Sequence, residues 1–98
     1  MIKVELPPHL RRFTQERRTV EVDVDGAATI SSVLDAVEQA YPALRGTIRD
    51  HGAGPRRAFI RFFAAGEDLS LQSPETPLPD AVASGKEALM IVGAISGG

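Results

Sequence analysis

The spacing of the apolar residues changes along this chain, and that change constrains its fold more than any other feature. Residues 2–6 (IKVEL) and 18–24 (RTVEVDV) alternate apolar and polar side chains, which predicts two strands with one buried face each. Residues 25–42 switch to helical spacing and place their apolar side chains on one helix face. These side chains are Ile30, Val33, Leu34, Val37 and Tyr41. Two strands followed by one helix predict an α+β domain in which the helix covers one face of a sheet.

Capping and breaking residues set the boundaries of this helix. Thr29 is a suitable N-cap, and Pro42 ends the helix because it restricts the residue before it. Asp35 and Glu38 are expected on the solvent side of the helix. The following residues, 43–57, predict one short helical turn and then a surface loop rich in glycine and proline.

The second half of the chain predicts further strands separated by loops. The apolar run AFIRFF at 58–63 leads into a turn, and a short strand is expected at 68–71, so that the two form a hairpin. Three prolines at 74–79 exclude a central strand and predict a loop, with a helical turn at Asp80 to Ala83. The run ALMIV at 88–92 predicts the last strand. The element order is therefore β-β-α-β-β-β.

Composition places the chain among ordinary globular domains and disfavours several classes of function. Apolar residues make up 43% of its 98 residues and charged residues 24%, as expected of one folded domain. The net charge of −2 has the wrong sign for a nucleic-acid-binding domain, so the arginine pairs at 11–12, 17–18 and 56–57 are interpreted as solvated loop charges. The lack of cysteine and of long apolar runs predicts a cytoplasmic protein without a membrane segment, and the modest size and charge are compatible with a monomer.

The chain has no pattern of a conventional active site. His9 and His51 lie in expected loops without a patterned nucleophile or carboxylate beside them. Glu67 and Asp68 are adjacent on an expected strand and point to opposite faces, so they are not interpreted as an acid–base pair. Because no metal-ligand spacing or phosphate-binding motif occurs, we expect neither a metal nor a bound cofactor.

The segment 93–98 (GAISGG) does not fit the strand and helix patterns. It contains three glycines and no charged side chain, which makes it too apolar for a solubilising tail and too flexible for a core. One interpretation is a frayed end or a cloning remnant. The other is that the α-carboxylate of Gly98 is a reactive group, because it is ionised at neutral pH and can attack an activated phosphate. Glycines beside it can thread a narrow enzyme channel.

Three stretches, together with the element order, resemble a known family. They are FIRFFAAGEDL at 59–69, PLPDAVASGKEALMIV at 77–92 and AISGG at 94–98. These features are similar to the ThiS/MoaD-type ubiquitin-like sulfur carriers. The resemblance implies a β-grasp fold with a mixed sheet of four to five strands, one main helix on one face and a flexible C-terminal tail. It divides the chain into a β-grasp domain, 1–92, and a tail ending in Gly-Gly, 93–98.

The resemblance also implies a role for the tail. In this family an E1-like enzyme that uses ATP and Mg adenylates the terminal glycine carboxylate, which then becomes a thiocarboxylate. The sulfur passes to a downstream acceptor enzyme, so the resemblance implies a carrier that is a substrate of enzymes and not an enzyme itself. Gly98 would carry the sulfur and Gly97 would share the channel, while Ala94, Ile95 and Ser96 would form the threaded arm.

The resemblance leaves the branch of the family open. The stretch GPRRAFIRFF at 54–63 looks most similar to the actinobacterial carrier of cysteine biosynthesis, with the molybdopterin carrier next. Gly93 stands where many family tails have a proline, and the turn AAGED lacks the polar residue that is common there. A ubiquitin-like modifier that joins Gly98 to target lysines would use the same tail. A plain binding module with an idle tail is the third alternative.

Strand parity predicts a partner-binding patch near the tail. If Ile60, Phe62 and Ala64 face the helix, Phe63 faces outward, and on the last strand Met90 and Val92 face outward as well. Phe63, Met90 and Val92 would then form an exposed apolar patch at the base of the tail, and such patches often mark interfaces. The alternative is ordinary packing of these side chains under a loop.

Overall fold

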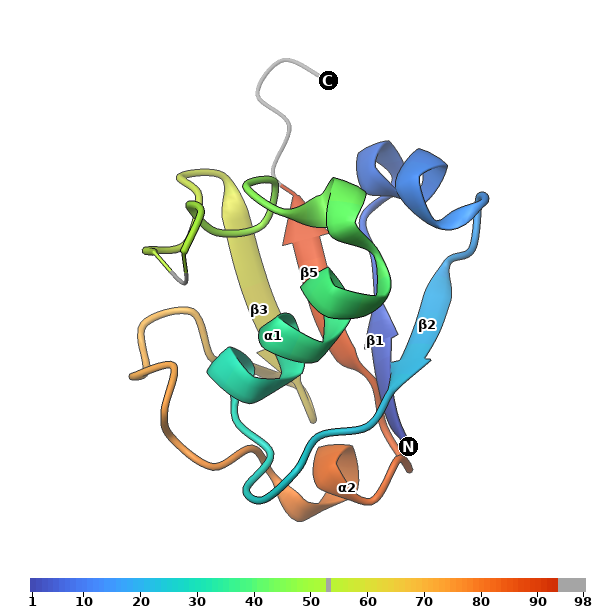
Figure 1. Ribbon diagram of the computed structural model, residues 1–98. Helices are drawn as coiled ribbons and strands as arrows, with labels where there is room; N and C mark the ends of the chain where they lie inside the picture. Colours follow the sequence, from blue (N-terminus) through green and yellow to red (C-terminus); the bar gives the residue numbers. More distant parts are fainter. Residues whose placement is uncertain (53, 94–98) are drawn as a thin grey trace.

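The computed structural model describes residues 1–52 and 54–93. A five-stranded sheet is covered on one face by the single long helix, and a short helix lies at one end of the sheet (Figure 1). The elements in chain order are β1 (Ile2–Glu5), η1 (Pro8–Thr14), β2 (Thr19–Val22), α1 (Ile30–Ala40), η2 (Pro42–Leu44), β3 (Ile60–Ala64), β4 (Glu67–Asp68), α2 (Asp80–Ala83) and β5 (Leu89–Gly93). The expected α+β architecture with one main helix and a mixed sheet is confirmed.

Strands β1 and β5 are neighbours in the middle of the sheet. The strand order is β2-β1-β5-β3-β4, and β1 and β5 run parallel, with Val4 opposite Leu89 and Glu5 opposite Met90. Both other neighbours of these strands are antiparallel. Consequently β1 and β5 finish at the same end of the sheet, the end that is uppermost in Figure 1. We call this the exit end, because residues 94–98 follow β5 in the sequence.

The core lies between α1 and the inner face of the sheet. The apolar residues that alternate along the strand sequences are the buried ones. Every second residue of β1, β2, β3 and β5 is buried. The helix begins at a capping box in which the Ser32 amide donates to Thr29 Oγ1 (3.0 Å) and the Thr29 amide donates to Ser32 Oγ (2.9 Å). The helix side chains that enter the core are Ile30, Val33, Leu34 and Val37.

The expected strand at 68–71 is wrong, because β4 contains only Glu67 and Asp68. Beyond that point one backbone bond remains, from the Leu69 amide to the Phe62 carbonyl (2.7 Å), and side chains take the other partners: the Phe62 amide donates to Ser70 Oγ (2.8 Å), and the Ser70 amide donates to Asp68 Oδ1 (2.9 Å). Leu69 turns into the core, whereas Leu71 is 87% exposed. The chain therefore leaves the sheet after Leu69, whose amide makes the last backbone bond to β3.

Two further boundaries differ from the sequence expectation. The polar connection after β1 forms the 3-10 helix η1, which begins with Pro8 and buries Leu10 and Thr14. Strand β5 extends one residue further than expected, and its last residue, Gly93, lies opposite Ile60 of β3. In the part of the chain that the structure describes, no helix has the length and apolar character needed to span a membrane.

Candidate functional site at the exit end

The candidate site is built where β5 finishes, directly before the tail. Strand β5 pairs in parallel with β1 only at Leu89 and Met90, whereas its last three residues pair in antiparallel register with β3 alone. The tail residues named from the sequence, Ala94, Ile95, Ser96, Gly97 and Gly98, lie outside the described residues. What the structure defines is the point from which they start and the surface around that point.

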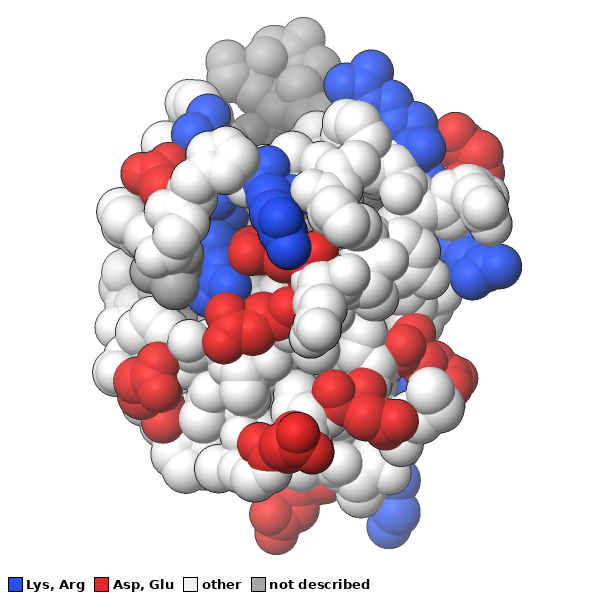
Figure 2. Space-filling model, in the orientation of Figure 1, with Lys and Arg blue, Asp and Glu red and all other residues white. Residues whose placement is uncertain are grey.

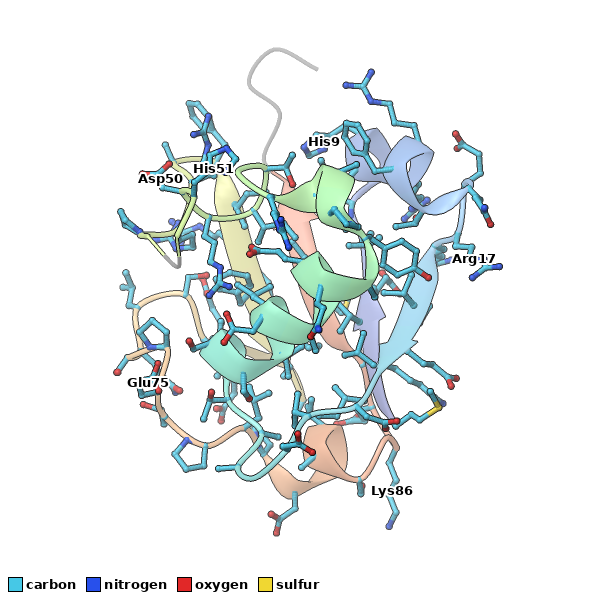
Figure 3. The ribbon with its side chains drawn as sticks, in the orientation of Figure 1. His9, Arg17, Asp50, His51, Glu75 and Lys86 are labelled. Atoms are coloured by element: carbon cyan, nitrogen blue, oxygen red, sulfur yellow. The ribbon has the colours of Figure 1, made fainter. Side chains whose placement is uncertain are left out.

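Gly93 is closely covered by the segment that follows β1. A Cβ atom built on Gly93 would lie 2.5 Å from His9 Cε1, 3.1 Å from His9 Nδ1 and 3.5 Å from Pro7 Cβ. The backbone of Gly93 is not in the left-handed region, so a side chain here would conflict only with the neighbouring imidazole, which would have to move. Figure 3 shows His9 on η1 at the exit end, beside the end of β5. The root of the tail therefore has His9 packed directly against it.

The three residues of the expected patch lie on the outer face of the sheet, opposite the face covered by α1. Phe63 is directly opposite Met90, and Val92 is directly opposite Arg61. Met90 is 39% exposed and Val92 is 37% exposed, while Phe63 is half-buried. These side chains are grouped as strand parity requires. The binding role of Phe63, Met90 and Val92 stays a prediction.

Polar groups fix the edge of this patch at β4. Asp68 lies opposite Phe63, and its Oδ2 accepts a hydrogen bond of 3.0 Å from Arg61 Nη1. Hydrogen bonds from the hydroxyl and the amide of Ser70, with a smaller contribution from Arg61, hold the pKa of the Asp68 carboxyl below its ordinary value. The aromatic ring of Phe63 is thus flanked by Met90 on one side and by an anchored carboxylate on the other.

A buried arginine attaches the long loop of the exit end to α1. Arg49 is 5% exposed, and its Nε lies 2.9 Å from Glu38 Oε2 while its Nη2 lies 2.6 Å from Asp35 Oδ1. Burial by itself lowers the pKa of the Arg49 guanidinium, but hydrogen bonds to Glu38 and Asp35 outweigh it and hold this pKa above its ordinary value.

The interpretation of Glu38 as a solvent-facing residue is therefore wrong, since its side chain is only 13% exposed beneath Arg49. Asp35, at 65% exposed, does face solvent. A hollow of about 530 Å³ opens over these groups and is also lined by His51 and Arg45. Its carboxylates are already engaged by Arg49, so the hollow is part of the structural attachment of the loop. Among the described residues, no group of three or more His, Asp or Glu side chains is placed to hold a metal ion.

The two histidines set aside in the sequence have different positions. Both are exposed, but His9 belongs to η1 and packs against Gly93, whereas His51 lies in the loop and packs against Gly46 (Figure 3). Sequence reasoning missed the role of His9 and the burial of Arg49. The contact of His9 with Gly93 and that of Arg49 with Glu38 join residues that are distant in the sequence. Local residue spacing therefore does not predict them.

Comparisons with known proteins give one relative in sequence and several in structure. No family model matches the chain. Small archaeal modifier protein 1 of Haloferax volcanii is 41% identical over an alignment of 68 residues, which covers 58% of this chain and 78% of that protein. The crystal structure of the same Haloferax volcanii protein superposes with a TM-score of 0.73 and 29% identity over 98% of this chain and 97% of that one. A chain of the Amycolatopsis orientalis BexX/CysO complex gives a TM-score of 0.76 over 100% of both chains at 24% identity, which is evidence for the fold alone.

Proposed function

This chain belongs to the ThiS/MoaD-type family of ubiquitin-like sulfur carriers and modifiers, and from that premise we propose that Gly98 carries its reactive group. The expected ubiquitin-like β-grasp fold is confirmed by the sheet order and by the structural matches. The observation that carries the proposal is the 41% identity to a small archaeal modifier protein, in a chain whose sequence has a diglycine at the fourth and fifth positions after the central strand β5.

The proposed chemistry takes place on a partner enzyme that uses ATP and Mg. A carboxylate oxygen of Gly98 attacks the α-phosphorus of ATP, and pyrophosphate leaves, which gives an acyl-adenylate. Hydrosulfide, delivered by the partner from the sulfur donor, then attacks the glycine carbonyl carbon, AMP leaves with the bonding electron pair, and the remaining S–H proton passes to solvent. The product is a thiocarboxylate, whose sulfur an acceptor enzyme consumes. This chain supplies the substrate carboxylate and the surface by which the enzymes recognise it.

The folded domain has two features that suit this role. The tail follows the middle strand of the five-stranded sheet, and β5 is paired with β3 up to its last residue, so the partner meets a strand end that is held in the sheet. The outward side chains Met90 and Val92 lie on that same strand, directly before the tail. We propose that Phe63, Met90 and Val92 contact the activating enzyme while residues 94–98 enter its channel.

Mass spectrometry tests the proposal. The purified chain is incubated with an E1-like enzyme from its own source, ATP, Mg and a sulfur donor, and the intact mass is expected to change by one oxygen replaced by one sulfur. Fragmentation should place the change on Gly98. A variant without Gly97 and Gly98 is the matched control and should show no change. Persistent absence of the sulfur-containing product, although the enzyme activates a known carrier, would contradict the proposal.

The acceptor pathway is a finer proposal, and we favour cysteine biosynthesis. The resemblance of residues 54–63 to the actinobacterial cysteine carriers supports this pathway. The structural similarity to the BexX/CysO complex chain supports the shared fold. The test is to supply the thiocarboxylated chain to a cysteine-synthase-like enzyme and to a molybdopterin-synthase large subunit in parallel. Consumption of the thiocarboxylate only by the molybdopterin enzyme would favour the molybdopterin branch instead.

A second candidate function is protein modification, which the name of the 41% identical relative favours. In that role a lysine amine of a target protein attacks the carbonyl carbon of the Gly98 acyl-adenylate, AMP leaves with the bonding electron pair, the amine loses a proton, and an isopeptide bond results. The discriminating measurement is a denaturing blot of cells that express the tagged chain. Adducts of higher mass that disappear on removal of Gly97 and Gly98 would establish modification, and both functions can share one tail.

A further inference from the structure

The charged residues of this chain are segregated along its long axis. All nine arginines lie in two segments, 9–18 and 45–61, which contain only two acidic residues. The rest of the chain has eleven acidic residues and two lysines. A net charge of −2 therefore conceals two parts of opposite sign, one strongly basic and one strongly acidic.

The basic segments come together at the exit end. Segment 9–18 contains most of η1, which packs against η2 and covers Gly93 through His9. Segment 45–61 follows η2 and leads into the first residues of β3, beside the end of β5. On the face seen in Figure 2, basic side chains predominate in the upper half and acidic side chains in the lower half. Figure 3 likewise places Arg17 and His9 in the upper half and Glu75 in the lower half.

The nine arginines differ in the interactions that their guanidinium groups make. Four of the nine are paired with carboxylates: Arg18, Arg49, Arg57 and Arg61. Among the described residues, the other five make no ion pair with a carboxylate, and two of these five, Arg11 and Arg56, instead donate to backbone carbonyls. Arg12, Arg17 and Arg45 remain, and all three are exposed; Arg12 lies over the Phe13 ring (4.8 Å to its centroid), and Arg17 Nη1 donates to the Tyr41 hydroxyl (3.4 Å). We call Arg12, Arg17 and Arg45 the arginine crown.

We propose that the arginine crown docks on an acidic protein surface around the channel of the enzyme that takes up residues 94–98. This inference rests on the proposed function and adds the chemistry of the partner. Exposed guanidinium groups form paired hydrogen bonds with carboxylates, so they suit a rim of Asp and Glu side chains. A cluster of one sign at the approaching end also steers the two proteins together before contact. The acidic far end of the domain is repelled by the same surface, so the tail is presented first.

Charge favours a protein partner over nucleic acid. A nucleic acid presents negative charge along its whole length, so the eleven acidic residues outside the two segments would oppose binding. A folded acidic surface of limited size can face the exit end alone. The steering field is set by the nearest charges, because salt screens charges beyond about 8 Å at physiological ionic strength.

The experiment measures association of the chain with its activating enzyme by stopped-flow fluorescence at several salt concentrations. The variant Arg12→Glu/Arg17→Glu/Arg45→Glu should associate at least about tenfold more slowly at low salt and should lose most of the salt dependence. Arg45→Glu alone should show a smaller effect of the same kind. Lys86→Glu makes the same change of charge at the far end and should stay within about twofold of the wild type. Circular dichroism should show that all variants are folded.

The outcomes separate this inference from the proposed function. If the wild type supports ATP–pyrophosphate exchange but the arginine variants associate as fast as Lys86→Glu, the inference is overturned and the proposed function stands. If the wild type supports no exchange with an active enzyme, both fall. A third arm measures fluorescence anisotropy with a duplex DNA oligonucleotide at physiological salt. Tight binding there that the triple variant loses, with enzyme association unchanged, would assign the crown to nucleic acid instead.

Discussion

The imidazole of His9 lies against the backbone of Gly93, so that a Cβ atom at the last position of β5 would fall 2.5 Å from His9 Cε1. Pro7 completes the contact, with its Cβ 3.5 Å from the place a Cβ of residue 93 would occupy. The departure from the family's usual proline at this position thus has a local explanation. Glycine at 93 lets η1 close over the end of the central strand, and the tail leaves the domain beside His9.

Gly93→Ala should destabilise the domain by about 1–2 kcal/mol, because the new methyl group meets the His9 ring and one of the two must move. Chemical denaturation measures the loss. His9→Ala, which shortens an exposed side chain, should by itself cost less than about 0.5 kcal/mol. In the double variant His9→Ala/Gly93→Ala most of the loss should be recovered. Equal losses in the single and double alanine variants at 93 would contradict this steric explanation.

Arg49→Met should reduce the free energy of unfolding by about 3 kcal/mol, because the side chain of Glu38 would keep its charge beneath the loop without its partner. Urea denaturation followed by circular dichroism measures the change. Arg45→Met is the matched control on the same loop, since Arg45 is exposed, and it should change stability by less than about 0.5 kcal/mol. Adding Glu38→Met to Arg49→Met should restore part of the stability. A loss no larger than that of Arg45→Met would show that the pair contributes nothing.

The Asp68 carboxyl should titrate below the ordinary aspartate range, because the ionised form is stabilised by Ser70 and Arg61. A pKa lowered on folding means that the stabilisation is fully present above the pKa of the unfolded chain and is lost as pH falls through the folded value. The test is an NMR titration of the Asp68 carboxyl carbon. Ser70→Ala should raise this pKa toward its ordinary value, and Arg57→Ala, which removes an arginine paired elsewhere, should leave it unchanged.

Met90→Thr/Val92→Thr should weaken binding to the activating enzyme by about tenfold while leaving the fold intact. Threonine suits an exposed strand position, so the change removes apolar contact area without adding charge. Isothermal titration calorimetry measures affinity, and thermal unfolding checks the fold. Leu71→Thr is the control, since Leu71 is a more exposed apolar side chain in another part of the surface. If the control weakens binding as much as the double variant does, the patch has no special role.

Hydrophobic spacing was sufficient to predict the elements that form the core. The strand faces of Val20, Val22, Phe62 and Ile91 and the helix face of Val33 follow from periods of two and of 3.6, because burial on one face is a local property of the sequence. The order of elements then limited the fold to a sheet with one covering helix. The exposed positions of Met90 and Val92 followed from the same parity.

What the sequence did not predict depends on contacts between distant segments. Arg49 looks like any polar loop residue until the path of the loop places it over Glu38. His9 and Gly93 come from opposite ends of the sequence and meet only because β1 and β5 pair in parallel. Strand β4 is short because the hydroxyl of Ser70 accepts a hydrogen bond from the Phe62 amide. Strand propensity does not predict this side-chain hydrogen bond.

The parallel pairing of β1 and β5 also determines when a newly made chain can enter its pathway. The ribosome releases residues 89–93 after all the other strands, and β5 is the strand that joins the β1–β2 pair to the β3–β4 pair. Until β5 is inserted, both pairs have an unfilled edge, and the loop to be closed spans nearly the whole chain. The root of the tail can therefore be completed only after residues 89–93 have been synthesised. An enzyme that recognises the completed exit end selects finished molecules and ignores chains still under synthesis.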